Sequence, residues 1–280
     1  MKIAIASGKG GTGKTTLATN LALSLDNVQL FDCDVEEPDS HLFLDMKLKK
    51  IEDVFISIPE VDKTKCDFCG KCSKFCQYHA LAVIKSDVLF FPDLCHGCGG
   101  CTLVCPKNAI TEKKRTIGII EGAENGNFEF YQGLLNIGEA MASPIIKVLK
   151  TRIKDSKTVI LDSPPGTACP VIESVKDTDY VILVTEPTPF GLYDLKLAVE
   201  MLYFLRIPFG VVINRDGIGD DRVEVYCKDE GINILMKIPH DENIARLYSK
   251  GIPFVQELPG WKHDLKTLFE KINSSLEGGS

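Results

Sequence analysis

The most restrictive feature of the sequence is a glycine-rich stretch that joins an apolar run to a helical one. Residues 8–15 read GKGGTGKT and follow the apolar run Lys2–Ser7, and Lys14–Leu25 has the pattern of a helix. A glycine-rich turn between a buried strand and a helix presents backbone N–H groups and the positive end of the helix dipole to an anion. The stretch therefore predicts a strand–loop–helix unit that binds phosphate.

Two nucleotide motifs fit this stretch. Its glycines, followed by Asp32, match the fingerprint of a dinucleotide site, in which the acid holds a ribose. The same stretch matches a P-loop, which needs the Lys14 ammonium for the β and γ phosphates and the Thr15 hydroxyl for magnesium. Only the P-loop uses that pair, and Asp162 ends a further apolar run, where a nucleotide hydrolase holds magnesium through its water shell. The sequence therefore favours a nucleoside triphosphate with Mg²⁺.

Apolar runs alternate with helical stretches through most of the chain. The further candidate strands are Val28–Asp32, Thr158–Asp162, Tyr180–Thr185, Phe209–Asn214 and Asn233–Ile238. The further candidate helices are Leu192–Leu205, Asp220–Glu230, Glu242–Lys250 and Lys262–Leu276. Alternating strands and helices imply parallel strands joined by crossover helices, so the predicted class is α/β with a doubly wound, mostly parallel sheet of the P-loop NTPase type.

Eight of the 11 cysteines lie between Cys66 and Cys105, in two runs of the same spacing, C-x2-C-x2-C-x3-C. This is the run of bacterial ferredoxins, in which the fourth cysteine of a run ligates the other cluster. Zinc is the alternative, but a zinc site stops at four ligands in two pairs. The runs predict two 4Fe-4S clusters, one on Cys66, Cys69, Cys72 and Cys105 and the other on Cys76, Cys95, Cys98 and Cys101.

The cysteine-rich segment interrupts the alternation of strands and helices. It lies between Ile58–Glu60, interpreted as turn-like, and the charge run Lys113–Arg115, interpreted as a solvated boundary. We expect residues 62–113 to form a small α+β ferredoxin-like domain, which its clusters hold folded. It would be inserted into a P-loop domain made of residues 1–61 and 114–276, with 277–280 as a flexible tail.

Charge and hydropathy exclude several classes of partner. The chain has 32 Lys and Arg against 39 Asp and Glu, a net charge of −7, which attracts neither nucleic acid nor anionic lipid. No apolar run approaches the roughly 18 residues that cross a bilayer, and the opening residues do not resemble a signal peptide. We expect a cytoplasmic protein. The apolar positions from Trp261 to Leu276 are interpreted as a core-facing stripe rather than a membrane anchor.

The stretch Gly8–Thr16, with its additional lysine Lys9, resembles the deviant Walker A motif of the superfamily that contains MinD, ParA, Mrp and the nitrogenase iron protein. The resemblance covers nearly all of the chain outside the cysteine segment. Residues 135–141 also resemble the linker of MinD-type ATPases that carry an inserted ferredoxin domain. The resemblance implies a slow, partner-stimulated ATPase that forms a nucleotide-dependent homodimer.

The resemblance also implies roles for individual residues. Lys9 reaches the phosphates of the other subunit, Lys14 binds the β and γ phosphates and Asp34 orients the attacking water; Asp39 competes with Asp34 for that role. The implied magnesium ligands are Thr15, Asp34 and Asp162. The implied nucleotide contacts are Gly8, Gly10, Gly11, Thr12, Gly13, Lys14, Thr15, Thr16, Gly166, Asn214, Pro239 and Asp241.

Two functional hypotheses follow. In the first, ATP binding and hydrolysis switch a dimer that gates electron transfer to a partner protein, or iron-sulfur or other metallocentre assembly on it. The eight-cysteine segment favours this hypothesis. In the second, the chain is a nucleotide-dependent positioning or interaction module, as in MinD and ParA relatives, with structural or sensory clusters. Cys169, which follows the Asp162 loop, is a minor candidate for redox or metal binding.

Overall fold

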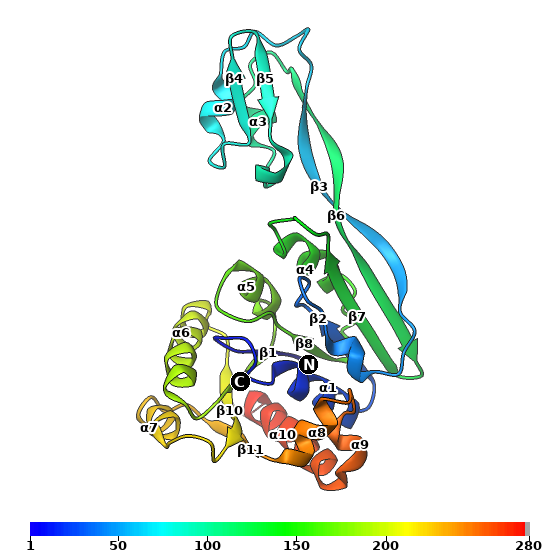
Figure 1. Ribbon diagram of the computed structural model, residues 1–280, viewed down its shortest axis with the longest axis vertical. Coiled ribbons are helices and arrows are strands. Elements are labelled where there is room, and N and C mark those ends of the chain that lie inside the picture. Colours follow the sequence, from blue (N-terminus) through cyan, green and yellow to red (C-terminus); the bar gives the residue numbers. More distant parts are fainter. Residues whose placement is uncertain (278–280) are drawn as a thin grey trace.

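The computed structural model describes residues 1–277, so the expected tail lies outside the described residues except for Glu277. Its main feature is a nine-stranded sheet, from which two strands continue as a ribbon (Figure 1). In spatial order the strands are β11 (Ile234–Pro239), β10 (Phe209–Asp216), β9 (Tyr180–Thr185), β1 (Lys2–Ala6), β8 (Thr158–Asp162), β2 (Val28–Asp32), β7 (Phe128–Leu135), β6 (Ile110–Asn125) and β3 (Lys49–Val61).

The strands from β11 to β7 pair in parallel, whereas β6 and β3 pair antiparallel. Every residue of β2 and β9 is buried, as expected for parallel strands that are covered on both faces and read as continuous apolar runs. The sequence predicted β1, β2, β8, β9, β10 and β11, with ends that differ by at most two residues. The predicted mostly parallel α/β fold is therefore confirmed.

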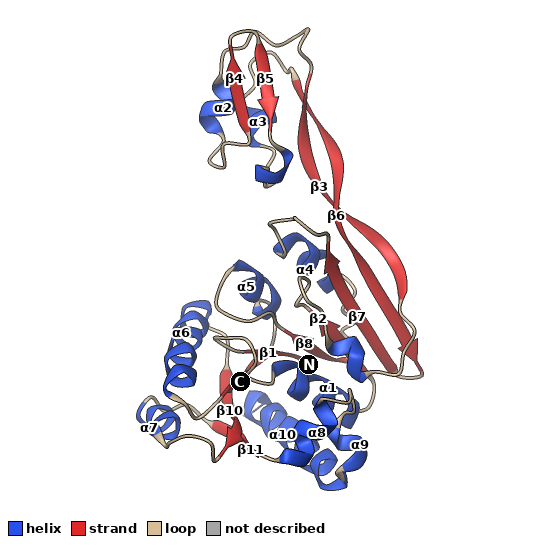
Figure 2. Ribbon diagram, viewed as in Figure 1, coloured by secondary structure: helices blue, strands red, loops and turns tan. Residues whose placement is uncertain are grey.

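Helices cover both faces of this sheet (Figure 2). One buried cluster lies under α1 (Lys14–Ser24), α8 (Glu242–Tyr248), α9 (Phe254–Glu257) and α10 (Pro259–Glu277). A second lies under α4 (Ser143–Lys150), α5 (Cys169–Val175), α6 (Pro189–Leu205) and α7 (Arg222–Asp229). Leu265, Leu268 and Ile272 of α10 are buried, which confirms the core-facing stripe. Within residues 1–277 no helix is long and apolar enough to span a bilayer.

The ribbon of β3 and β6 corrects the interpretation of the segment boundaries. Ile58 pairs with Lys113 and Pro59 with Glu112, so neither the turn-like residues nor the charge run ends the strands. Proline is compatible with this position because β3 is the edge strand of the sheet, where an N–H is dispensable. The charges fit because the ribbon projects away from the core into solvent, where residues 111–114 are all exposed.

The cysteine-bearing unit is an internal repeat at the end of the ribbon. It contains α2 (Lys71–Phe75), β4 (Leu81–Ile84), β5 (Asp87–Phe90), the 3-10 turn η2 (Pro92–Leu94) and α3 (Gly100–Leu103). The steps from Cys66 to Cys95 and from Cys76 to Cys105 are both 29 residues. The backbone repeats as well, because β4 pairs with β5 as the start of β6 pairs with the end of β3.

Substitution of Phe130 tests the packing of the core that the large sheet forms with its helices. Its side chain is fully buried between the sheet and α1, so we expect Phe130→Ala to lower the free energy of unfolding by about 3–5 kcal/mol. Urea unfolding followed by the fluorescence of Trp261, the single tryptophan, which contacts Phe254 in the same core, measures it. Phe204, which is 87% exposed on α6, is the control, and Phe204→Ala should change the value by less than about 0.5 kcal/mol. Equal effects of the two substitutions would contradict this packing.

Candidate functional site

The glycine-rich stretch forms a tight loop between β1 and α1. Gly13 has a φ of 94° and directly precedes α1, whose N-terminal N–H groups receive no cap from a described side chain. A Cβ atom at Gly13 would lie 2.3 Å from the Asn214 amide nitrogen. A Cβ atom at Gly8 would lie 2.1 Å from the backbone oxygen of Asp194 in α6. Both glycines are therefore required for close packing, and the loop leaves its N–H groups free for an anion.

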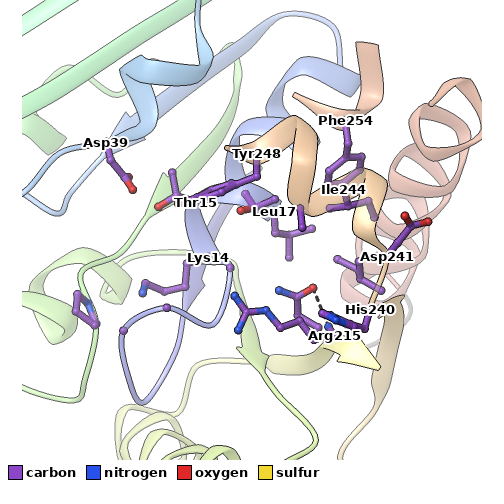
Figure 3. Close-up of a pocket in the computed structure, with 18 of the residues that line it drawn as sticks. Lys14, Thr15, Leu17, Asp39, Arg215, His240, Asp241, Ile244, Tyr248 and Phe254 are labelled. Carbon is purple, nitrogen blue, oxygen red and sulfur yellow. Dashed lines mark hydrogen bonds between the residues drawn. The ribbon is translucent and has the colours of Figure 1, made fainter. Parts of the chain in front are cut away.

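A cavity of about 480 Å³ opens over this loop, within the size range of small-molecule sites. Figure 3 shows Lys14 and Thr15 at one end and His240, Asp241 and Ile244 at the other. Of the predicted nucleotide contacts, the cavity is lined by Gly10, Gly11, Gly13, Lys14, Thr15, Thr16, Asn214, Pro239 and Asp241.

Three of the predicted contacts lie behind the cavity lining. Gly8 packs on α6, as described above. Thr12 is 2% exposed, and its hydroxyl has no partner among the described residues. The backbone N–H of Gly166 donates to the Ser7 carbonyl at 3.0 Å, which ties the loop after β8 to the end of β1.

Three carboxylates gather where β2 and β8 end. One oxygen each from Asp32, Asp39 and Asp162 lies within 4.8 Å of the others. Asp32 accepts backbone N–H bonds from Asp34, Asp39 and Ser40 at 2.9–3.0 Å. The Ser40 hydroxyl donates to Oδ2 of Asp162 at 3.2 Å, while Oδ1 of Asp162 is buried without a partner among the described residues.

This crowding changes the proton affinity of the acids. Burial raises the pKa of Asp162 to about 7, although the Thr15 hydroxyl and the Lys14 ammonium oppose the shift. Burial and the neighbouring Asp162 raise the pKa of Asp32 well above its ordinary value. Burial also raises the pKa of Asp34 to about 6, against the effect of Lys14. A divalent cation would stabilise these carboxylates in their charged form, so their arrangement suits a metal ion.

The structure distinguishes the two acids that the sequence left in competition. Asp34 and Asp39 both line the cavity, but Asp39 belongs to the group of three carboxylates. Asp34 lies outside that group and has Lys14 as its main cationic neighbour.

Lys9 lies apart from the cavity lining. Its Nζ contacts Oε2 of Glu186 at 3.0 Å, and the other oxygen of Glu186 accepts from Arg215 at 2.7 Å. Glu186 directly follows β9 and is 6% exposed. Sequence analysis missed Glu186 because its partners come from two distant segments.

The far end of the cavity combines β10, β11, α8 and α9. The Asn214 side-chain amide donates to the Thr12 carbonyl at 2.8 Å, and the Asp241 carboxylate accepts the N–H of Asn243 and caps α8. Several residues that line the cavity were missed, because tertiary packing rather than a local motif brings them together. These are Arg215, Ile244, Tyr248 and Phe254.

The eight clustered cysteines surround two smaller cavities. One is lined by Cys66, Cys69, Cys72 and Cys105. The other is lined by Cys76, Cys95, Cys98 and Cys101. The structure thus brings together the same two sets of four that the ferredoxin spacing groups. Cys169 lies elsewhere, exposed at the start of α5.

Backbone geometry around these cysteines repeats with them. The N–H groups of Ala80 and Ala109 donate to the sulfurs of Cys76 and Cys105 at 3.3 and 3.2 Å.

The raised pKa of Asp162 predicts how stability varies with pH. Since the folded-state pKa of about 7 lies above the ordinary value of 3.8, the folded chain holds a proton that the unfolded chain releases between these values. The free energy of unfolding without metal should therefore fall as pH rises from about 4 to about 7. Asp162→Asn should reduce this fall, measured from urea midpoints at both ends of the range. The exposed Asp155 is the control, and equal pH profiles for Asp162→Asn and Asp155→Asn would contradict the assignment.

Known proteins resemble this chain along nearly its whole length. An uncharacterized protein of Methanocaldococcus jannaschii is 34% identical over 278 residues, which cover 97% of this chain and 96% of the relative. An iron-sulfur cluster carrier protein of Pyrococcus horikoshii is 26% identical over 309 residues, covering 99% of this chain and 86% of the relative.

Solved structures share the fold. The cell division ATPase MinD of Pyrococcus furiosus matches with a TM-score of 0.60 at 18% identity, covering 97% of this chain and 99% of that one. The septum site-determining protein MinD of Pyrococcus horikoshii, complexed with Mg-ADP, has a TM-score of 0.59 at 19% identity and covers 96% and 94%. A family model for the CobQ/CobB/MinD/ParA nucleotide binding domain matches residues 3–254, so the chain belongs to this family.

Proposed function

We propose that the protein binds and hydrolyses ATP with Mg²⁺ and that the nucleotide switches a homodimer. The observation that carries this proposal is the buried Oδ1 of Asp162 beside the P-loop, which accepts no hydrogen bond from any residue that the structure describes. An uncompensated buried carboxylate oxygen is unfavourable, and a hydrated divalent cation is the partner that the donor set suits. Thr15, Asp39 and Asp162 would hold the ion, with Asp39 taking the place that the sequence gave to Asp34.

The chain's own groups account for hydrolysis through position and charge. Lys14, which is 7% exposed, and the loop N–H groups neutralise the β and γ phosphates. Asp34, with a pKa of about 6, is mainly ionised at neutral pH and accepts a hydrogen bond from the attacking water. Phosphoryl transfer needs little covalent participation from the protein, so these contacts and Lys9 of the other subunit supply the catalysis.

We propose that the nucleotide base occupies the end of the cavity formed by β10, β11 and α8. Asn214 and the Pro239–Asp241 segment line it from two neighbouring strands. In this proposal the base lies between them, and Phe254 and Ile244 supply apolar contact. Asn214 reads the base edge and also supports the P-loop through Thr12.

We propose that residues 62–113 form a ferredoxin-like domain with two 4Fe-4S clusters. The two sulfur sets and the repeated N–H···S bonds support it. Bound clusters of this kind carry one electron each. The remaining residues, 1–61 and 114–276, form the ATPase domain.

The two parts are connected by the ribbon of β3 and β6 (Figure 1). The Asp32 loop leads through the 3-10 turn η1 (Ser40–Phe43) into β3, which runs to the first cysteine set. The Val35 carbonyl in this loop accepts the N–H of Leu135 at 2.8 Å. At the other end of the ribbon, a Cβ atom at Gly97 would lie 3.0 Å from the Ser57 carbonyl oxygen. We propose that nucleotide-driven movement of the Asp32 loop passes along this path to gate electron transfer to, or metallocentre assembly on, a partner protein.

Single cysteine substitutions test the cluster assignment. Cys69→Ser and Cys98→Ser each remove a ligand from a different set, so each should lose about half of the iron while the other cluster keeps its absorbance. Cys227→Ser is the control, because Cys227 is buried in α7 and belongs to neither set. Iron content per chain measures the outcome, and full iron in both variants would contradict the assignment.

An anaerobic redox titration tests the coupling. We expect ATP, compared with ADP or no nucleotide, to move a cluster potential by about 30 mV, equivalent to about 0.7 kcal/mol for one electron. Electron paramagnetic resonance follows each cluster. Lys14→Ala, which removes the phosphate-binding ammonium, is the control and should show no nucleotide effect. Cluster potentials that do not change with nucleotide in the native protein would contradict electron gating and favour cluster delivery or the positioning module.

A further inference from the structure

Glu186 binds two cations from different parts of the nucleotide site. Its Oε2 contacts Lys9 of the P-loop at 3.0 Å, and its Oε1 contacts Arg215 of the cavity lining at 2.7 Å. The Glu186 side chain is 8% exposed, whereas those of Lys9 and Arg215 are 33% and 50% exposed. A buried carboxylate is therefore held between two cations that reach it from solvent.

The double pairing allows one cation to leave. A buried carboxylate that loses its only partner is strongly destabilised. Here, departure of Lys9 leaves Glu186 paired with Arg215, which extends from β10. Lys9 can therefore leave Glu186 without exposing the buried carboxylate to the loss of its last cation.

Lys9 is also the member of the trio that has room to move. It precedes Gly10 and Gly11, which are both exposed, and a Cβ atom at Gly11 would meet no described atom within 4 Å. Glu186, in contrast, directly follows β9 and Arg215 lies in β10, two strands that pair in the sheet. Exchange of the ion pair therefore moves the loop tip rather than the sheet.

We propose that Glu186 is a positioning residue that holds Lys9 within its own subunit, so that Lys9 exchanges Glu186 for a phosphate oxygen when the dimer closes. This inference rests on the proposed function, from which it takes the ATP-dependent dimer. Glu186 then sets how readily nucleotide-bound subunits associate. A carboxylate that merely stabilised the fold would not have this effect.

The test measures the dimer dissociation constant of the cluster-loaded protein by anaerobic sedimentation with Mg²⁺ and a non-hydrolysable ATP analogue at saturation. Glu186→Gln keeps the shape but weakens the hold on Lys9, so the dimer should tighten by about three- to tenfold. Arg215→Gln leaves Lys9 as the only cation on Glu186, so the dimer should weaken by a similar factor. The opposite signs keep the test decisive if one variant does not fold.

Two further variants isolate the contact. In a Lys9→Ala background, Glu186→Gln should leave the dimer constant unchanged, because the contact is already absent. Glu173→Gln is the matched control. The Glu173 side chain is buried to a similar degree as that of Glu186, and it also pairs with two cations, Lys147 and Lys176.

The outcomes separate the two proposals. If the native protein dimerises with the analogue and Glu186→Gln, still binding it, matches the native constant or weakens the dimer, the role of Glu186 is overturned while the proposed function stands. If the native protein binds the analogue but stays monomeric, the proposed dimer switch fails, and the role of Glu186 fails with it.

Discussion

The carboxylate of Asp32 is the contact on which the nucleotide site depends. It is fully buried at the end of β2 and accepts backbone N–H bonds from Asp34, Asp39 and Ser40. These bonds give the loop its shape, so Asp39 turns back toward Asp162 while Asp34 faces the cavity. A side chain that organises a loop in this way suffers a desolvation cost, and the three backbone donors offset part of it.

The position of the site follows from the parallel sheet. Carboxyl ends of parallel strands meet at one edge, and ligands of such folds bind there, near the point where strand order reverses. Here β1 lies between β8 and β9, and the acids, Glu186 and Asn214 lie in or after the carboxyl-terminal parts of β2, β8, β9 and β10. The antiparallel strands β6 and β3 lie at one side of the sheet, so their extension adds the cysteine unit without crossing the nucleotide cavity.

Sequence reasoning succeeded where chemistry depends on local spacing. Central strands read as apolar runs because both faces are buried, and the P-loop and cysteine runs are contiguous. It failed for β3 and β6, because a ribbon in solvent tolerates Pro59 and the charges of Lys113–Arg115, which resemble a boundary. It also failed for Arg215, Tyr248 and Glu186, whose proximity arises only from tertiary packing. The proposed replacement of Asp34 by Asp39 as a magnesium ligand depended on interatomic distances, which the sequence does not contain.

The exchange of fourth cysteines between the two halves of the repeat has a consequence for how the unit can be altered. Each cavity takes three sulfurs from one half and the fourth, Cys105 or Cys76, from the other. Deleting either half would leave the other half with three of the four cysteines of its set, so each half depends on the other. The unit can therefore be moved, duplicated or lost only as a whole.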